Sequence, residues 1–435
     1  MKPVASQDHH NLRTLARRRL PSKIFNRLRE IGALADAMDA SAYLVGGLVR
    51  DLLLGQTNLD VDIAVEGDAM TFARRLADRY GAGLKVFEKF ATALVVFSDG
   101  FKLDVATARC ESYVHPTALP TVKPSPIKDD LYRRDFTINA LAIRLNVSRF
   151  GELVDFYGGL RDLEHKVIRV LHARSFVDDP TRVFRAIRFE QRFGFRIEKH
   201  TLTLLKEAAA SDLVHRLSGP RLRNEVMRLL SEQAPIRTIR RMAEFDLLRF
   251  LHTGLVWTAR LAGLLSDLGK SLAWWTKQYP RRSLDRALVY FIGLMDELSA
   301  SATGAVVKRL ALPGEQANKI RLAKKHLAPA LRFLVRHRSP RPSETYQALA
   351  DLPDEGLVLL VAKARSKDIV RLVSAYVTTQ QQVRPSLNGA DLKAMGLKPG
   401  PIYKKILDRL LEARLNGEVK TKADERELAK KLAKV

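Results

Sequence analysis

Hydrophobic positions separate the chain into a first part that mixes helix and strand and a second part that is helical. Apolar residues recur at helical spacing over residues 24–38, which predicts a helix. Residues 59–65 then alternate between apolar and polar, which predicts a strand with one face in the core. Asp60 and Asp62 occupy polar positions of this strand, so both carboxylates are expected on the same face.

Shorter apolar runs predict the rest of a small sheet. Residues 43–45 predict a strand that ends at a Gly-Gly pair, and the runs at 141–145 and 153–156 predict two more strands. The runs at 93–97 and 101–105 predict a hairpin, because an Asp-Gly turn separates them. We therefore expect a mixed α/β sheet flanked by helices.

Beyond Asp179 the spacing of apolar residues is helical almost to the end. The helical periods cover residues 183–194, 200–210, 221–231, 283–298, 315–334 and 355–377. Proline and positive charge interrupt the pattern near 278–282 and 336–343, which predicts exposed connections. The expected parts are an N-terminal arm or helix (1–35), an α/β head (36–160), and an all-α neck (161–235), body (236–340) and tail (341–435).

Charge indicates the kind of partner. The 435 residues contain 74 Lys and Arg against 48 Asp and Glu, a net charge of +26, which favours a polyanion. Nucleic acid is the first candidate and an acidic membrane surface is the alternative, but no stretch approaches about 18 uninterrupted apolar residues. Residues 1–19 also lack the apolar run of a signal peptide, so we expect a cytoplasmic protein. The single cysteine, Cys110, excludes an intramolecular disulfide and a cysteine-based zinc site.

Two glycines join the strand at 43–45 to a helix. Gly46 and Gly47 precede an apolar helical face that begins at Leu52, so backbone amides at the helix start are expected to approach an anion such as a triphosphate. A tight corner without a ligand is the alternative interpretation of a Gly-Gly turn.

Two aspartates on one strand face are typical of a metal site. Asp60 and Asp62 are about 6–7 Å apart along a strand, which suits a pair of Mg²⁺ ions with oxygen ligands. Asp104 occupies a polar position of the hairpin strand at 101–105 and is a candidate third carboxylate. A solvated edge strand is the alternative for an isolated Asp-x-Asp, and the nearby Gly-Gly turn argues against it.

These residues resemble the nucleotidyltransferase superfamily and, more closely, the bacterial class II tRNA nucleotidyltransferase and poly(A) polymerase family. Residues 44–51 with Asp60-Val61-Asp62 are similar to the family's first motif. The segments similar to the later motifs, in order, are Arg133-Arg134-Asp135-Phe136-Thr137-Ile138-Asn139-Ala140, Asp155-Phe156-Tyr157-Gly158-Gly159 with Asp162-Leu163, Asp178-Asp179-Pro180-Thr181-Arg182 with Arg185 and Arg188, and Arg221-Leu222-Arg223-Asn224-Glu225.

The resemblance implies template-independent addition of nucleotides to the 3′ end of tRNA. It implies two Mg²⁺ ions at Asp60 and Asp62, ATP and CTP as substrates, a catalytic head and a neck that recognises the base. Residues expected to contact the nucleotide by this resemblance are Gly46, Gly47, Arg50, Arg134, Asp179, Arg182, Arg185 and Arg188.

The fourth motif also has a physical interpretation of its own. Pro180 after Asp179 predicts that Asp179 caps a helix, and Arg182, Arg185 and Arg188 then recur every three residues on one side. By the resemblance, Asp179 and Arg182 hydrogen-bond the edge of the incoming base, and the later arginines reach its phosphates and sugar. Residue 178 departs from the family, which has glutamate there, and the shorter Asp178 puts in doubt how rigidly this pair is held.

A helical hairpin is predicted near the C-terminus. Residues 389–395 and 402–414 read as helices joined by a Gly- and Pro-containing turn, with basic residues around it. Lys398, Lys404 and Lys405 are candidate contacts to phosphates of the tRNA acceptor stem or TΨC arm, and a merely solvated basic face is the alternative.

Several activities remain open within the family. Residues 86–92 lack the basic segment usual in its poly(A) polymerases, which favours addition to tRNA, and residues 107–113 belong to a segment long enough for the flexible loop of enzymes that add CCA or A. Full CCA addition and terminal-A addition are therefore both retained, and CC-only addition is disfavoured. The alternatives are a poly(A) polymerase of the same family and a non-catalytic RNA-binding protein; the sequence does not determine the oligomeric state.

Overall fold

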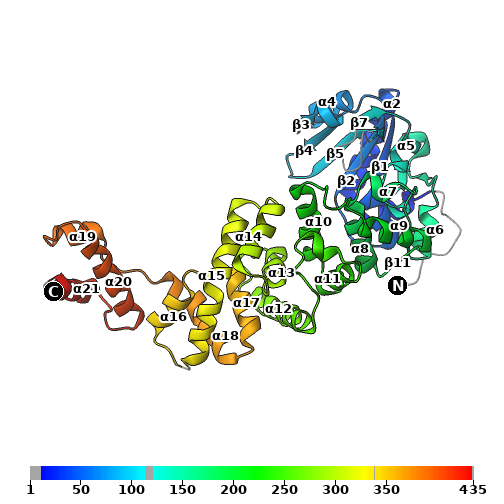
Figure 1. The fold of residues 1–435 in the computed structure, drawn as a ribbon. Helices are drawn as coiled ribbons and strands as arrows, with labels where there is room; N and C mark the ends of the chain where they lie inside the picture. The colour runs from blue at the N-terminus through cyan, green and yellow to red at the C-terminus, as the bar shows by residue number, and fades with distance from the viewer. Residues whose placement is uncertain (1–10, 113–120, 338, 434–435) are drawn as a thin grey trace. The chain divides into compact units, whose positions relative to one another are not determined.

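The computed structural model describes residues 11–112, 121–337 and 339–433, and Figure 1 shows its fold. The chain divides into two compact units, Met1–Leu217 and Ser218–Val435. All strands formed by the described residues belong to the first unit, and the second unit is helical. The predicted fold class, an α/β head followed by helical parts, is therefore confirmed. The finer division into five parts stays a prediction.

A seven-stranded sheet forms the centre of the first unit. In spatial order its strands are β3 (Gly83–Phe87), β4 (Thr92–Val96), β5 (Lys102–Thr107), β2 (Val61–Glu66), β1 (Ser41–Val45), β8 (Ala142–Arg144) and β9 (Leu153–Val154). Every neighbouring pair is antiparallel except β2 and β5, which run parallel. The two-stranded pairs are β6 (Arg109–Ser112) with β7 (Thr121–Pro124), and β10 (Val167–Ile168) with β11 (Arg196–Ile197).

The predicted strands are confirmed with small shifts. The hairpin forms between β4 and β5, and Gly100 in its turn has a φ of +81°, which glycine adopts readily. β2 begins at Val61, so Asp60 lies one residue before the strand instead of within it. In the segment at 107–113, where a flexible loop was expected, residues 109–112 form the short strand β6, and Tyr113 lies outside the described residues.

Helices cover the sheet and extend the first unit toward residue 217. They are α1 (Arg13–Arg19), α2 (Ser22–Ala37), α3 (Gly47–Leu54), α4 (Ala69–Tyr80), α5 (Ile127–Tyr132), α6 (Gly159–Glu164), α7 (Ser175–Asp178), α8 (Thr181–Phe193) and α9 (Lys199–Ala210), with short 3₁₀ turns η1 (Glu88–Phe90), η2 (Thr137–Asn139) and η3 (Val147–Arg149). Ile127 and Leu131 of α5 pack with Tyr43, Ala64 and Ala142 of the sheet in a buried apolar cluster. Asp62 lies two residues before Ala64 in β2 and therefore belongs to the same face of the strand.

The second unit consists of helices. They are α10 (Gly219–Ser231), α11 (Pro235–Glu244), α12 (Ala259–Gln278), α13 (Arg286–Leu294), α14 (Ala300–Arg309), α15 (Gly314–Arg336), α16 (Pro342–Leu349), α17 (Asp354–Ala364), α18 (Lys367–Thr378), α19 (Gly389–Ala394), α20 (Pro401–Leu415) and α21 (Lys422–Ala433), with 3₁₀ turns η4 (Leu247–Phe250) and η5 (Gln380–Gln382). The helical period at 355–377 is two helices, because Arg365 adopts a left-handed φ of +48° and ends α17. Among the described residues, each helix is too short or too polar to cross a lipid bilayer.

Candidate active site

Three predicted carboxylates lie close together at one end of β2 and β5. Asp62 and Asp104 are direct neighbours in the parallel register of these strands. Asp60 precedes β2, and its backbone amide donates to Oδ1 of Asn58 at 2.9 Å, which orders the approach to the strand. The structure therefore brings together the residues that the sequence singled out for catalysis.

The pKa values of these carboxyls reflect their crowding. The pKa of Asp62 is raised to about 6, first by burial and then by the negative charge of Asp60; Arg134 opposes the shift and Asp104 adds to it. Burial, followed by the charge of Asp60, also raises the pKa of Asp104, and Lys102 opposes this. A cation placed among the three groups would relieve this repulsion.

The carboxylates fit Mg²⁺ only together with a substrate. Within the described part of the chain, no group of three or more His, Cys, Asp or Glu side chains is arranged to hold a metal by itself. Mg²⁺ in proteins is usually bound by one or two carboxylates plus substrate phosphates and water. Asp60 and Asp62 can supply these two carboxylates, and the remaining ligands would then come from the substrate and water.

The predicted Gly-Gly turn lies directly beside Asp62. Gly46 has a φ of +78° and forms the N-cap of α3 without a capping side chain. A Cβ at Gly46 would lie 3.2 Å from an Asp62 carboxylate oxygen and 3.3 Å from an Arg134 guanidinium nitrogen. A Cβ at Gly47 would lie 3.4 Å from Arg50. The absence of side chains at both positions thus leaves a small cradle between a carboxylate and a cation, at the start of a helix.

Arg50 lies beneath this turn and is almost completely buried. Its Nε donates to Asp51 at 2.8 Å and its Nη1 to the side-chain oxygen of Asn139 at 2.5 Å, and its guanidinium lies over the rings of Phe189 and Phe193. Burial lowers the pKa of Arg50, and Asp51 opposes that shift. These contacts favour a role in bracing the turn over the predicted contact with the nucleotide.

The second motif continues the same network. Asn139 donates to Oδ1 of Asp135 at 2.8 Å, and Arg185 donates from Nε to Oδ2 at 2.8 Å. Burial raises the pKa of Asp135, but Arg185, Asn139 and Arg182 outweigh it and hold the value at about 2. An unbroken chain of charged hydrogen bonds therefore connects the turn after β1 with α8.

Arg134 lies between that network and the carboxylates. Its Nη2 donates to Oδ2 of Asp130 at 2.9 Å, and its buried Nε has no hydrogen-bond partner among the residues that the structure describes. Asp130 is 1% exposed and also accepts from Arg133. Asp130 was not predicted from the sequence, although an acid four residues before an arginine is a recognisable signal of an ion pair, here with Asp130 in α5 and Arg134 just after it.

In the fourth motif, Asp179 and Arg182 are held by different partners. Oδ1 of Asp179 accepts from the backbone amide of Thr181 at 3.0 Å and from its hydroxyl at 2.6 Å, so the predicted capping contact is present although α8 begins after Pro180. Arg182 is 5% exposed; it donates to Oγ of Ser175 and to the carbonyl of Arg133, both at 2.6 Å. Arg182 thus ties α7 and the second motif to the start of α8.

The shorter Asp178 also has partners. Arg174 approaches one of its carboxylate oxygens at 3.4 Å, and Nδ1 of His172 lies 4.0 Å from the other. Burial, followed by Arg182, lowers the pKa of His172, and Asp178 opposes this. The position where the family has glutamate is therefore supported from two sides.

The predicted RNA contacts lie in the second unit. Lys398 lies in the turn between α19 and α20, and Lys404 and Lys405 lie in α20; all three are exposed. The predicted helical hairpin is confirmed, with Leu392 of α19 and Ile406 of α20 in a shared buried cluster.

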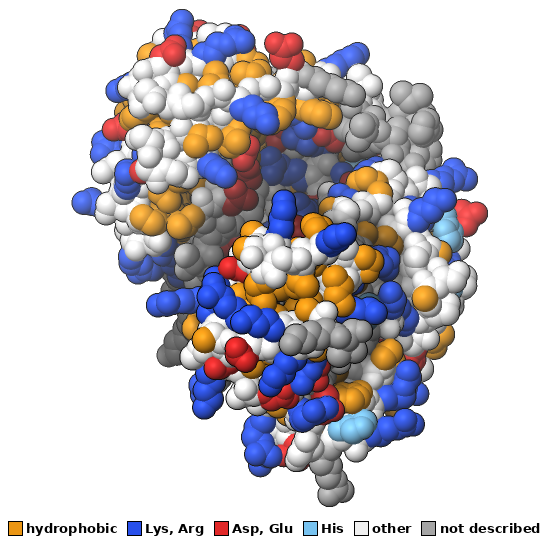
Figure 2. Space-filling model, turned by 90° about the vertical axis from the view of Figure 1, so that its left-hand side faces the viewer, with side chains coloured by type: hydrophobic (Ala, Val, Ile, Leu, Met, Phe, Trp, Pro, Cys, Tyr) orange, Lys and Arg blue, Asp and Glu red, His pale blue; other side chains and the backbone are white. Residues whose placement is uncertain are grey.

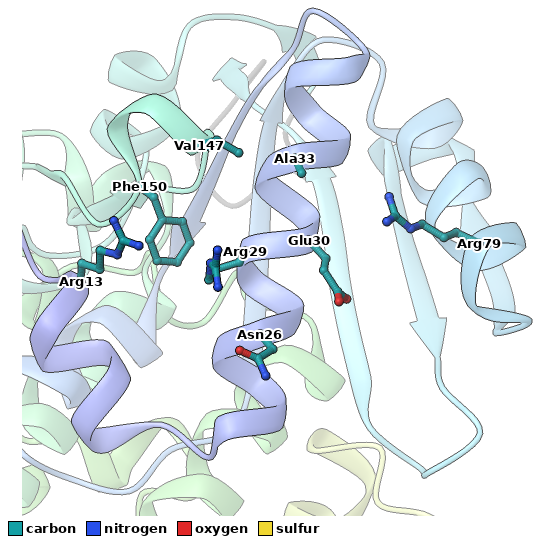
Figure 3. Close-up of a pocket in the computed structure, with 8 residues that line it drawn as sticks. All are labelled: Arg13, Asn26, Arg29, Glu30, Ala33, Arg79, Val147 and Phe150. Atoms are coloured by element: carbon teal, nitrogen blue, oxygen red, sulfur yellow. The ribbon is translucent and has the colours of Figure 1, made fainter.

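A separate hollow in the first unit is lined by other residues. Its lining comes from α1, α2, α4 and the segment at η3, and includes Arg13, Arg29, Arg79 and Phe150. In Figure 3 the Phe150 ring lies between Arg13 and Arg29, while Arg79 lies on the other side of α2. None of the predicted site residues lines this hollow.

Comparison with known proteins identifies the family. Residues 42–169 match the family model described as the poly A polymerase head domain, and residues 194–256 match that described as a probable RNA and SrmB- binding site of polymerase A. An A-adding tRNA nucleotidyltransferase of Geobacter sulfurreducens is 44% identical over 96% of this chain, which spans 48% of that relative's length. The A-adding tRNA nucleotidyltransferase of Halalkalibacterium halodurans is 33% identical over 97% of this chain and 95% of the relative.

A solved structure agrees with these matches. The Thermotoga maritima CCA-adding enzyme complexed with tRNA is 36% identical, aligns with 98% of this chain and 100% of that one, and has a TM-score of 0.75. Because the Halalkalibacterium relative matches along nearly its whole length, the chain belongs to the bacterial tRNA nucleotidyltransferase and poly(A) polymerase family of enzymes.

Proposed function

We propose that this chain adds the terminal adenosine to tRNA that ends in CC, using ATP and no nucleic acid template. The observation that carries the transfer chemistry is the crowding of Asp60, Asp62 and Asp104 beside the glycine cradle. The choice of terminal adenosine rests on the two A-adding relatives.

In this proposal the RNA 3′-hydroxyl oxygen attacks the α-phosphorus of ATP and forms the new phosphodiester bond, its proton is released to solvent, and pyrophosphate leaves. Asp60 and Asp62 would hold two Mg²⁺ ions, which would lower the pKa of the hydroxyl and place positive charge against the leaving group. Asp104 holds the local negative charge that attracts these ions. The amides after Gly46 and the guanidinium of Arg134 orient the triphosphate.

Asp179 and Arg182 select the base. Asp179 accepts a hydrogen bond from an exocyclic amine, and Arg182 donates to the neighbouring ring nitrogen. Adenine and cytosine both present this pattern, whereas uracil does not, so this pair rejects UTP but does not separate ATP from CTP. The bonds of Arg182 to Ser175 and to the Arg133 carbonyl use two of its five N–H donors, so the guanidinium keeps donors for the base.

Complete CCA addition is the second candidate. It is favoured by the alignment of almost the whole chain with the Thermotoga enzyme. Either activity needs a polyanionic substrate, which agrees with the net charge of +26 and with the Lys and Arg side chains spread over the face in Figure 2.

The test uses three tRNA transcripts, ending before CCA, after its first C and after CC. Each is incubated with protein, Mg²⁺ and labelled ATP or CTP, separately and together. Addition of a single A to the CC-ended transcript alone supports the proposal. Completion of all three to CCA supports the second candidate, and long A tails would contradict both.

A further inference from the structure

Four aromatic side chains form a continuous surface in the first unit. The ring of Tyr132 lies 5.5 Å from Tyr157 and 5.2 Å from His172, and Phe156 lies 6.2 Å from Tyr157. We refer to Tyr132, Phe156, Tyr157 and His172 as the aromatic ledge. It joins residues of α5, of the third motif and of the segment before α7.

The ledge is exposed but fixed. Tyr132 is 45% exposed and Phe156 49%, which is unusual for rings of this size. Tyr157 is held from below, because its hydroxyl donates to the carbonyl of Lys128 at 2.9 Å and its ring packs against the buried cluster of α5 and the sheet. The two outer rings, those of Tyr132 and Phe156, are therefore not explained as packing residues of the first unit.

The ledge has a positive rim and reaches the site of base selection. Nζ of Lys128 lies 6.0 Å from the centre of the Phe156 ring, and the exposed Arg174 pairs with Asp178. His172 lies within 4.0 Å of Asp178, and Tyr132 directly precedes Arg133, whose carbonyl binds Arg182. The aromatic faces thus continue outward from the residues proposed to read the incoming base.

We propose that the aromatic ledge stacks the unpaired 3′-terminal bases of the RNA substrate, with Tyr132 and Phe156 as positioning residues. Exposed rings with interspersed cations are what single-stranded nucleic acid requires, because every base has a face that stacks and each linkage carries a negative charge. The identity of the RNA rests on the proposed function. Stacking would hold the 3′ end while the incoming nucleotide enters.

The test measures binding of two RNA hairpins of equal stem, one with an unpaired ACC tail and one blunt. Tyr132→Leu and Phe156→Leu keep apolar bulk but remove the flat ring. Each is expected to weaken binding of the tailed RNA by roughly 5- to 100-fold, the range for loss of one base stack, and to leave the Kd of blunt RNA and ATP unchanged. Tyr132→Phe and Phe156→Tyr should retain wild-type affinity.

Phe87→Leu is the matched control. Like the outer rings of the ledge, Phe87 is exposed, at 41%, and has a lysine nearby, with Nζ of Lys85 5.2 Å from its ring centre. It does not belong to the ledge, because it lies in the edge strand β3. It should bind both RNAs as the wild type does. If both leucine variants of the ledge bound the tailed RNA with wild-type affinity, the proposal would be overturned. It would also be overturned if they lost affinity for the tailed and the blunt RNA equally and had a lowered melting temperature. Failure of the wild type to extend any tRNA would instead overturn the proposed function, and the binding comparison would still decide the ledge.

Discussion

Arg185 of α8 donates from two of its nitrogens to one carboxylate oxygen of Asp135, at 2.8 and 2.5 Å. The two residues are 50 positions apart in the sequence and belong to the fourth and second motifs. Asp135 is 7% exposed, so its charge depends on this partner. The contact fixes the helix that carries base selection to the motif beside the carboxylates.

Replacing Arg185 by alanine should lower the free energy of unfolding by about 3 kcal/mol at pH 7, because a buried carboxylate loses its main partner. The folded pKa of Asp135, about 2, lies below its usual value of 3.8, so this stabilisation is present above pH 4 and lost as the pH falls toward 2. Urea unfolding of both proteins at pH 7, 4 and 3 measures the difference. Arg192→Ala, an exposed arginine of the same helix, should cost little at any pH. If the variant lost the same free energy of unfolding at all three pH values, this account would be contradicted.

Replacing Asp60 or Asp62 by asparagine should lower the rate of nucleotide transfer about 1000-fold or more, because the proposed metal ligands lose their charge. Affinity for tRNA should stay within about twofold, since the proposed function places these groups at the triphosphate and not at the RNA stem. Single-turnover transfer and filter binding measure the two quantities. If transfer survived in either variant, the assignment of the metal ions would be wrong.

Mg²⁺ should stabilise the protein in a way that depends on pH and on Asp62. The pKa of Asp62 is raised to about 6 from 3.8, so its favourable contribution is present below about pH 4 and lost as the pH rises through 6. Without metal, Asp62→Asn should therefore melt higher than the wild type at pH 7.5 but not at pH 4, by roughly 2–4 °C for each kcal/mol. Added Mg²⁺ with ATP should raise the wild-type melting temperature at pH 7.5 and leave that of the variant nearly unchanged. Equal responses of the two proteins would argue against a metal at Asp62.

Arg182→Ala should reduce discrimination against UTP about 10- to 100-fold, because one of the two groups that read the base is removed. The relative kcat/KM for ATP, CTP and UTP on CC-ended tRNA measures the change. Arg192→Ala provides the control and should keep wild-type selectivity. A uniform loss with all three nucleotides would indicate that Arg182 acts only by holding Ser175 and the Arg133 carbonyl.

Lys404→Ala with Lys405→Ala should weaken tRNA binding and make it less sensitive to salt, because each phosphate contact contributes about 0.9 to the slope of log affinity against log salt. Titrations between 50 and 200 mM salt, roughly the range over which such contacts are screened, measure this. The exposed pair Lys430 and Lys431 of α21, changed in the same way, serves as the comparison. An unaltered slope would place the RNA elsewhere.

The sequence predicted correctly those strands and turns whose conformation depends on residues close to one another in the chain. The alternation around Asp62, the turn at Gly100 and the glycine turn at Gly46 are all present in the structure. The strand β3 was not predicted: Leu84 and Val86 alternate with Lys85, but this run is short, and four of the five residues of the strand are exposed. The break at Arg365 was missed because it contains neither glycine nor proline.

Long-range pairing could not be deduced from the sequence. Arg50 was expected at the nucleotide, and its burial depends on Asn139, which is 89 positions away. The bond between Arg182 and the carbonyl of Arg133 spans 49 positions in the same way. Charged residues are usually exposed, so only the assembled network indicates which of them are buried.

The parallel pairing of β2 with β5 has a consequence for folding. Val61 and Leu103 are register partners, so Asp62 and Asp104 become neighbours only after a long loop has closed. Antiparallel hairpins such as β4 with β5 can form early from nearby residues, whereas this pairing is non-local and slow by comparison. A nascent chain that has not yet reached Lys102 therefore has Asp60 and Asp62 without Asp104, and the third carboxylate joins them only after the intervening strands β3 and β4 have been made.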